Sequence, residues 1–334
     1  VPSGDEARPV AGGLGAEVSA IDFSVLLVRT SRIGGRVVNP DGSPATGGTV
    51  QLSASAQGTA GRGRPASVYG GRIQADGQFS IANVPPGRYT LRARGAAARI
   101  PAYATQPVMA GGGDIPDVSV VLAPAATISG AIRLESTRSA ALPNPSQWRV
   151  AAPALDLDGI GPNSEARVDQ DGDFTLEGLP AGPHWLRGAQ TPRGWMLKSV
   201  LVDGRETIDA PFTLDSGQKL TGVTVVFTDQ LSEISGTVTD ARGVPVTELT
   251  VLAFPRDDSL WRPQARQIMT ARPDQNGKFQ MRGLPPGQYY LAAIDPAEQG
   301  EWFEPAFLEQ QRPGAVSLTL VEGDIKTQDF TISP

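Results

Sequence analysis

The chain has 334 residues, of which 40% are hydrophobic and 19% charged, a composition that supports packed cores and excludes a disordered polymer. It contains no cysteine, which excludes disulfides and Cys-based metal sites, and its net charge of −6 argues against a nucleic-acid partner. The 39 Gly and 29 Pro, without a collagen-like triplet, indicate many tight turns between short strands. No stretch reaches the roughly 20 apolar residues that a membrane-spanning helix needs.

Three segments, 71–91, 166–186 and 271–291, repeat one pattern. Each has an Asp-Gly or Asn-Gly pair, which supplies the positive φ of a tight hairpin turn, at 76–77, 171–172 and 276–277. A short alternating strand follows, and then a Pro-x-Gly turn and a second strand. The pattern predicts that the alternating strand points two residues inward in each repeat: Phe79 and Ile81, Phe174 and Leu176, Phe279 and Met281.

An opening strand and a closing strand repeat in register with this pattern. The opening strands begin at Ile33, Ile128 and Ile234, and the closing strands cover 118–122, 223–227 and 330–332. Gly35 and Gly130 are 95 residues apart, as are Phe79 and Phe174. The opening strand and the alternating strand therefore keep the same spacing in the first and second repeats. We therefore predict an all-β chain of three tandem seven-stranded Greek-key β-sandwiches arranged end to end, at 32–124, 125–230 and 231–334.

The segment 1–31 contains a further closing-strand pattern. Ile21, Phe23, Val25 and Leu27 alternate as the closing strands do, although no opening strand precedes them. We interpret this segment as the closing strand of a missing upstream domain, cut off naturally or by the choice of chain. An unpaired strand is an adhesive edge, so donation of this strand to a neighbouring subunit would build a head-to-tail filament.

The runs 234–246 and 277–293, which read ISGTVTDARGVPV and GKFQMRGLPPGQYYLAA, resemble the carboxypeptidase regulatory-like domain. This transthyretin-like, Ig-like β-sandwich occurs in tandem in bacterial exported proteins. The resemblance is clear in the first and third copies and weaker in the second. It implies a Greek-key sandwich in each copy and an exported placement, extracellular or on the cell surface. It carries no catalytic residues to transfer. The signal peptide that export requires is absent from this chain, so we expect it to lie upstream or to have been removed.

Few residues are candidates for chemistry. Asp169, Asp171 and Asp173 have the alternation of a calcium loop, but they lie on a turn of the repeat, and the other copies do not keep the ligand set. We therefore favour an ordinary turn and expect no metal and no cofactor. His184 is the single histidine and aligns with Arg88 and Gln288, so we expect a half-exposed strand residue. No Gly-x-Ser-x-Gly elbow occurs, and we predict no catalytic residue.

Tryptophans in irregular stretches could stack on sugars or contact a protein. Trp195, Trp261 and Trp302 are the candidates, although loop tryptophans more often pack under loops, whereas Trp185 is expected in a core. The residues 304–311 carry the one helical signal.

We conclude from the sequence that this is not an enzyme but an extracellular structural or adhesive protein, and a filament subunit if strand donation occurs. Self-association or contact with neighbouring domains is then expected. The alternative is a set of glycan- or protein-binding accessory modules of a larger exported enzyme or outer-membrane transporter.

Overall fold

The computed structural model describes residues 27–54, 68–96, 100–137, 142–155, 165–263, 265–297 and 300–332. Strands are their main secondary structure, as predicted, and the residues separate into two compact units at residues 125 and 126. The first unit holds one set of packed sheets, here called sandwich 1, and the second unit holds two sets, sandwiches 2 and 3. Among the described helices, none is long and apolar enough to cross a membrane.

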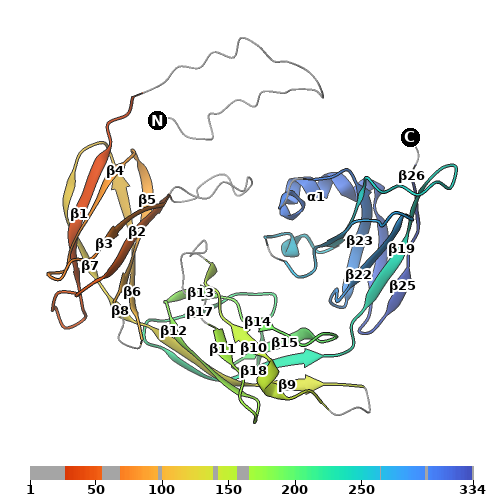
Figure 1. Cartoon of the computed structure of the whole chain (residues 1–334), viewed down its shortest axis with the longest axis horizontal. Coiled ribbons are helices and arrows are strands. Elements are labelled where there is room, and N and C mark those ends of the chain that lie inside the picture. The colour runs from red at the N-terminus through yellow and green to blue at the C-terminus, as the bar shows by residue number, and fades with distance from the viewer. Residues whose placement is uncertain are drawn as a thin grey trace. The chain divides into compact units, whose positions relative to one another are not determined.

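Sandwich 1 has two layers (Figure 1). One layer is a three-stranded sheet in the order β4-β1-β7, and the other is a five-stranded sheet in the order β3-β2-β5-β6-β8. The strands are β1 (Ser31–Val38), β2 (Gly48–Ala54), β3 (Val68–Arg72), β4 (Gln78–Val84), β5 (Gly87–Gly95), β6 (Ala102–Ala110), β7 (Ile115–Val121) and β8 (Ala123–Pro124).

Sandwich 2 departs furthest from the seven-stranded prediction, since sandwiches 1 and 3 have eight described strands each. Its first layer has five strands in the order β12-β9-β18-β15-β16, and its second layer is split into a sheet β11-β10-β14 and a ribbon β13-β17. The strands are β9 (Ala126–Glu135), β10 (Arg149–Ala151), β11 (Glu165–Arg167), β12 (Asp173–Leu179), β13 (Gly182–His184), β14 (Arg187–Gln190), β15 (Met196–Val202), β16 (Arg205–Glu206), β17 (Phe212–Leu214) and β18 (Lys219–Thr228).

Sandwich 3 has a first layer in the order β22-β19-β25, with β26 also paired to β19, and a second layer in the order β21-β20-β23-β24. Its strands are β19 (Glu233–Asp240), β20 (Thr250–Pro255), β21 (Met269–Ala271), β22 (Lys278–Arg282), β23 (Gly287–Ile294), β24 (Val316–Leu320), β25 (Ile325–Thr327) and β26 (Phe330–Ile332). The predicted helix is present as α1 (Pro305–Gln311).

The repeated pattern forms the elements predicted for it, with one correction. The turn glycines Gly77, Gly172 and Gly277 have φ of 83°, 92° and 73°, and all six inward-facing residues are buried. However, the Asp-Gly turn is not a hairpin within one sheet. In sandwich 1 it connects β3 to β4, which belong to opposite layers. The turn is therefore a corner that carries the chain across the core.

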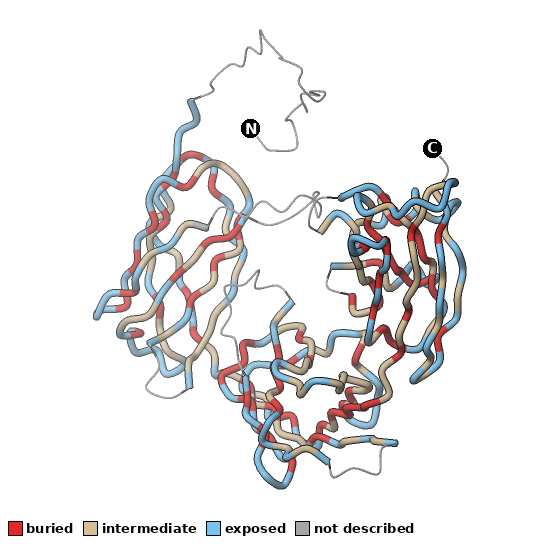
Figure 2. Tube along the Cα trace, turned by 45° about the vertical axis from the view of Figure 1, so that its right-hand side comes forward, coloured by how far each residue is buried: buried red, intermediate tan, exposed pale blue. Residues whose placement is uncertain are grey.

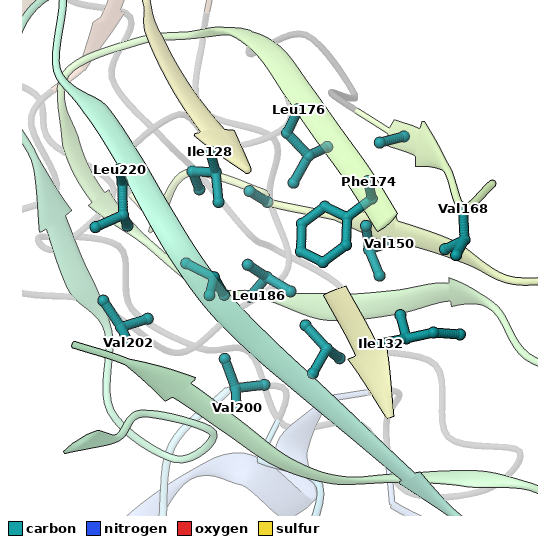
Figure 3. Packing of buried hydrophobic residues seen from close by; sticks show 14 of the residues in the cluster. Ile128, Ile132, Val150, Val168, Phe174, Leu176, Leu186, Val200, Val202 and Leu220 are labelled. Carbon is teal, nitrogen blue, oxygen red and sulfur yellow. The ribbon is translucent and has the colours of Figure 1, made fainter. Parts of the chain in front are cut away.

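The buried residues form one core for each of sandwiches 1 and 2. Buried and exposed residues alternate along most strands (Figure 2). Figure 3 shows how Ile128, Phe174 and Leu176 of the first layer of sandwich 2 meet Val150 and Leu186 of the second. Sandwich 3 has a second apolar cluster, in which Leu308 of α1 packs with Leu252 and Phe254 of β20. All six residues of β20 are buried, because both faces of its sheet are covered.

In each sandwich the opening strand pairs in parallel with the closing strand, and a glycine of the opening strand lies at the contact. The pairs are β1 with β7, β9 with β18, and β19 with β25 and β26. A Cβ atom added at Gly35, Gly130 or Gly236 would lie 1.9, 2.0 or 1.9 Å from a carbonyl oxygen of the closing strand. Because real Cβ atoms do not approach oxygen so closely, glycine is required there for the closing strand to dock.

We predict that Gly35→Ala separates β7 from β1 and destabilises sandwich 1 by about 3 kcal/mol, whereas Gly34→Ala changes its stability little. A Cβ at Gly35 would meet the Val118 carbonyl at 1.9 Å, but one at Gly34 has ordinary contacts from 3.5 Å. Hydrogen exchange of the β1 and β7 amides, measured by mass spectrometry, reports this sandwich alone. Equal protection in the two variants would contradict the requirement for glycine.

Candidate functional site

The connection that follows the Pro-x-Gly strand differs most among the repeats. In sandwich 2 it contains β15 and β16, which add to the edge of β18, and in sandwich 3 it contains the 3-10 helix Glu301–Phe303 and α1. The strand after this connection returns to a common register, since Tyr89 pairs with Val108, His184 with Phe212 and Tyr289 with Leu318. The connection is thus an insertion between two strands that pair in the same register in all three sandwiches. In sandwich 2 the side chains of this insertion contact sandwich 3.

The main polar contact between sandwiches 2 and 3 joins Asp209 to Arg266. Asp209 follows β16, and Arg266 lies in the loop between β20 and β21. The guanidinium Nε donates to Oδ1 and Nη2 to Oδ2, both at 2.9 Å, which is the bidentate geometry that makes an arginine–carboxylate pair strong. The side chains are 28% and 23% exposed, so water screens the pair less than a surface pair.

A second arginine of the same loop reinforces this junction. Arg262 donates to the backbone carbonyl of Asp209, and its guanidinium carbon lies 4.8 Å from the centre of the Trp185 ring. The guanidinium carbon of Arg187 lies 4.5 Å from the same ring, and its Nη1 donates to the carbonyl of Ile208 at 2.8 Å. Two cations on one aromatic ring combine cation–π attraction with flat packing.

A lysine joins the two sandwiches at another point. The Nζ of Lys198, on β15, donates to Glu135 of sandwich 2 at 2.7 Å and to Glu322 of sandwich 3 at 2.8 Å. The other carboxylate oxygen of Glu322 accepts from the Thr228 hydroxyl at 3.0 Å. Both Glu hydrogen bonds raise the pKa of Lys198, so the bridging ammonium keeps its charge.

The charges at the junction influence one another. Burial works against the charge on Asp209, but the hydrogen bonds and charge of Arg266, a hydrogen bond from Gln267 and the charge of Arg187 outweigh it. The pKa of Asp209 is therefore held below its ordinary value. Burial lowers the pKa of Arg187 to about 10; Asp209 opposes this shift, and Arg266 and Arg262 add to it. Arg187 nevertheless remains charged at neutral pH, and the junction forms with its ion pairs intact.

The structure corrects the predictions for His184 and Trp185. His184 is fully buried, not half-exposed, and its Nε2 lies 2.8 Å from the Pro180 carbonyl. In the other sandwiches a tyrosine hydroxyl donates to the same carbonyl four residues earlier, from Tyr89 to Pro85 and from Tyr289 to Pro285. His184 therefore occupies the corner position of these tyrosines, as the 95-residue offset from Tyr89 requires. Trp185 lies one residue later, half-buried at the junction and outside the core.

The structure places the three candidate tryptophans in packing contacts. Trp261 is 7% exposed, and its Nε1 donates to the Pro255 carbonyl at 2.8 Å. Trp195 is half-buried and lies edge-on against Trp148, with ring centres 5.8 Å apart. Trp302 is half-buried against the outer cluster of sandwich 3. The ring of Trp261 is thus closed to a sugar, while ligand contact by the other two remains a prediction.

The other predicted sites involve residues 21–27 and the acidic turn. Ile21, Phe23 and Val25 lie outside the described residues, and Leu27 is 94% exposed. Oδ1 of Asp169 accepts from the backbone N–H of Asp171 at 3.0 Å and of Asp173 at 2.8 Å, as in an ordinary turn. In the part of the chain that the structure describes, no group of three or more His, Asp or Glu side chains is placed to hold a metal.

Sequence reasoning missed the junction residues Asp209, Arg262 and Arg266. The available signal was their position in irregular stretches that depart from the repeat, the same stretches in which Trp195 and Trp261 lie. What distinguishes these stretches is contact between sandwiches.

A sequence model of the carboxypeptidase regulatory-like domain family matches residues 32–123 and 233–333, more than half of the chain. No curated protein matches. Among solved structures, similarity extends over 91% of this chain to 51% of the Bacillus anthracis TIE protein (11% identity, TM-score 0.23). The similarity to a streptococcal ancillary pilin covers 91% of this chain and 99% of the pilin (12% identity, TM-score 0.26). The similarity to GBS52, the Streptococcus agalactiae minor pilin, covers 59% of this chain and 95% of the pilin (14% identity, TM-score 0.30). The chain spans about half the length of the TIE protein, and similarities this distant carry no information about function.

We predict that His184→Phe destabilises sandwich 2 by about 1–3 kcal/mol, as Tyr289→Phe destabilises sandwich 3. Each change leaves at least one buried carbonyl oxygen without its donor: that of Ala152 or Pro180 in the first case, and that of Pro285 in the second. Hydrogen exchange resolved by sandwich measures both effects. Unchanged protection of sandwich 2 in the His184→Phe variant would contradict a stabilising role of the histidine contacts.

We predict that Asp209→Asn loosens the junction while leaving each sandwich folded, because it removes the charge that pairs with Arg266. A double-mutant cycle with Arg266→Met should give a coupling of about 1–2 kcal/mol. The distance distribution between spin labels on sandwiches 2 and 3 should broaden. Asp215→Asn, at an exposed residue outside the junction, is the control and should leave the distribution narrow.

The same pair should respond to acid. Because the pKa of Asp209 is lowered from its ordinary value of 3.8 in the folded chain, its contribution to stability is present above that value. The contribution is lost as the pH falls through the folded pKa. The unmodified junction should therefore loosen in acid, and Asp209→Asn should already be loose at pH 7. A spin-label distance distribution that is equally narrow at pH 7 and pH 2.5 would contradict this assignment.

Proposed function

Because the chain belongs to the carboxypeptidase regulatory-like domain family, we propose that it is a non-enzymatic extracellular structural protein that holds β-sandwich repeats in a fixed order. The observation that carries this proposal is the junction of sandwiches 2 and 3. The residues that depart from the repeat there are engaged in fixing one sandwich to the next: Asp209, Lys198 and Trp185 from one side, and Arg262, Arg266 and Glu322 from the other.

The polar side chains support a structural role in a second way. Asp41, Asp240 and Asp274 each accept hydrogen bonds within their own turn, which lowers the pKa of each carboxyl group. Asp41 accepts from the hydroxyl and the backbone N–H of Ser43, and the other two accept from backbone N–H groups. The buried histidine has both ring nitrogens against backbone carbonyls. These groups stabilise turns and corners and are not directed at a common point where a substrate would bind.

We further propose that copies of the chain associate through the N-terminal segment. Residues 21–27 have the alternation of a closing strand, whereas each sandwich already has its own closing strand, β7, β18 or β25 with β26. A donated strand would therefore add to the edge of a sheet and would not fill a vacancy. Edge addition in one direction generates a filament if the contact does not close on itself.

We predict that deletion of residues 1–28 abolishes polymerisation, as does Val25→Asp, which places a charge on the apolar face of the donated strand. Ser24→Asp, on the opposite face, should still polymerise. The measurement is negative-stain electron microscopy with sedimentation. Filaments that persist after the deletion would contradict strand donation. Specific glycan binding that is lost in Trp302→Ala, without any filament, would favour the accessory-module alternative.

A further inference from the structure

Sandwich 2 shows how the edge of a closing strand is completed in this chain. The outer edge of β18 is covered by β15, which is antiparallel to it and pairs Leu201 with Thr224 and Met196 with Thr228. Two residues of β15, Val200 and Val202, are buried in the core. The added strand therefore contributes backbone hydrogen bonds to the sheet and apolar side chains to the core.

Among its described residues, sandwich 1 has no counterpart of this strand. Its closing strand β7 pairs with β1 on one side and, among the described residues, with no strand on the other. The N–H of Leu122 donates to the carbonyl of Val38. Because alternate residues of a strand face opposite sides, the N–H groups of Ser119 and Val121 point away from β1. The outer edge of β7 thus offers unpaired backbone groups to an added strand.

The apolar side chains beside this edge are incompletely covered. Five of the six partly buried members of the core cluster belong to β7, the edge of its layer, and to β6, the strand next to the edge of the other layer: Ile115, Val118, Ala102, Ala104 and Val108. An inserted strand with one apolar face would bury these side chains, as Val200 and Val202 do in sandwich 2.

We propose that this edge of sandwich 1 accepts the segment Ile21–Leu27 of a second copy of the chain, antiparallel to β7. This deepens the proposed function, on which it rests, by assigning the acceptor. The segment has seven residues, as β7 does, and its alternate residues Ile21, Phe23, Val25 and Leu27 present one apolar face. Leu27, the one residue of the segment that the structure describes, is 94% exposed, so its side chain is available to a second copy.

A groove of about 530 Å³ lies beside β7 on the outward face of the same sheet, and its charged lining residues are Arg32, Arg36, Asp114 and Asp117. Its floor is open at Gly34, where sandwiches 2 and 3 have Ser129 and Ser235. The groove leaves room for the outward-facing side chains of an added strand, and the two cations and two anions that line it balance one another.

Cysteine cross-linking tests the acceptor directly, because the natural chain contains no cysteine. A tagged Ser24→Cys chain is mixed with an untagged Ser119→Cys chain and treated with a short bismaleimide. Since strand pairing holds the two thiols at millimolar effective concentration, the cross-linked heterodimer should exceed that of the control by at least about tenfold. The control acceptor is Ser317→Cys, at an exposed serine on β24, the edge strand of sandwich 3.

A second variant tests the backbone pairing. Adding Ser119→Pro to untagged Val121→Cys chains should abolish the heterodimer with Ser24→Cys, because proline removes an outward N–H without breaking the pairing with β1. Ser119→Ala in the same background should retain it.

The outcomes separate the acceptor from the proposed function. Filaments whose segment cross-links to Ser317→Cys and not to Ser119→Cys would overturn the acceptor and leave strand donation standing. Cross-linking only within a single Ser24→Cys/Ser119→Cys chain would overturn the second-copy occupant. A chain that is monomeric at all concentrations, without a cross-link, would overturn both proposals.

Discussion

The parallel docking of the last strand of each sandwich against its first is the constraint on which the rest of the structure depends. It requires a glycine at one position of the opening strand, because the closing strand places a carbonyl oxygen where a Cβ atom would be. Gly35, Gly130 and Gly236 meet this requirement in three otherwise divergent sequences. Once the closing strand is docked, the two layers enclose a core. The paired strands then hold the ends of the corners and insertions in fixed positions.

The three sandwiches differ in what they insert into this frame. The insertion of sandwich 2 adds β15 to the first layer and also supplies Lys198 and Asp209 to the junction with sandwich 3. The insertion of sandwich 3 is helical and covers the outer face of β20. In sandwich 1, as in sandwich 3, the outer edge of the closing strand has no paired strand among the described residues. One variable connection therefore determines whether a sandwich completes its own edge, contacts its neighbour or leaves an edge for another chain.

Much of the fold could be predicted from short-range pattern. The alternation around Phe79, Phe174 and Phe279 predicted which residues are buried, and α1 was predicted from its local sequence. The site could be predicted only in outline. His184 was assigned to a half-exposed position because it was aligned with Arg88, although the offset of the repeat aligns it with Tyr89. The hydrogen bond to the carbonyl four residues earlier, which histidine and tyrosine both form, identifies their common position.

The sequence by itself determined the all-β class, the three repeats, the inward residues and the turn glycines, because each follows from side-chain alternation or a backbone dihedral within a few residues. Only the tertiary structure decided which layer each strand joins, that the Asp-Gly turns cross between layers, and that Asp209 meets Arg266. Those outcomes depend on packing between segments that are not neighbours in the sequence, such as Asp209 and Arg266, which are 57 residues apart and whose contact leaves no periodicity in the sequence.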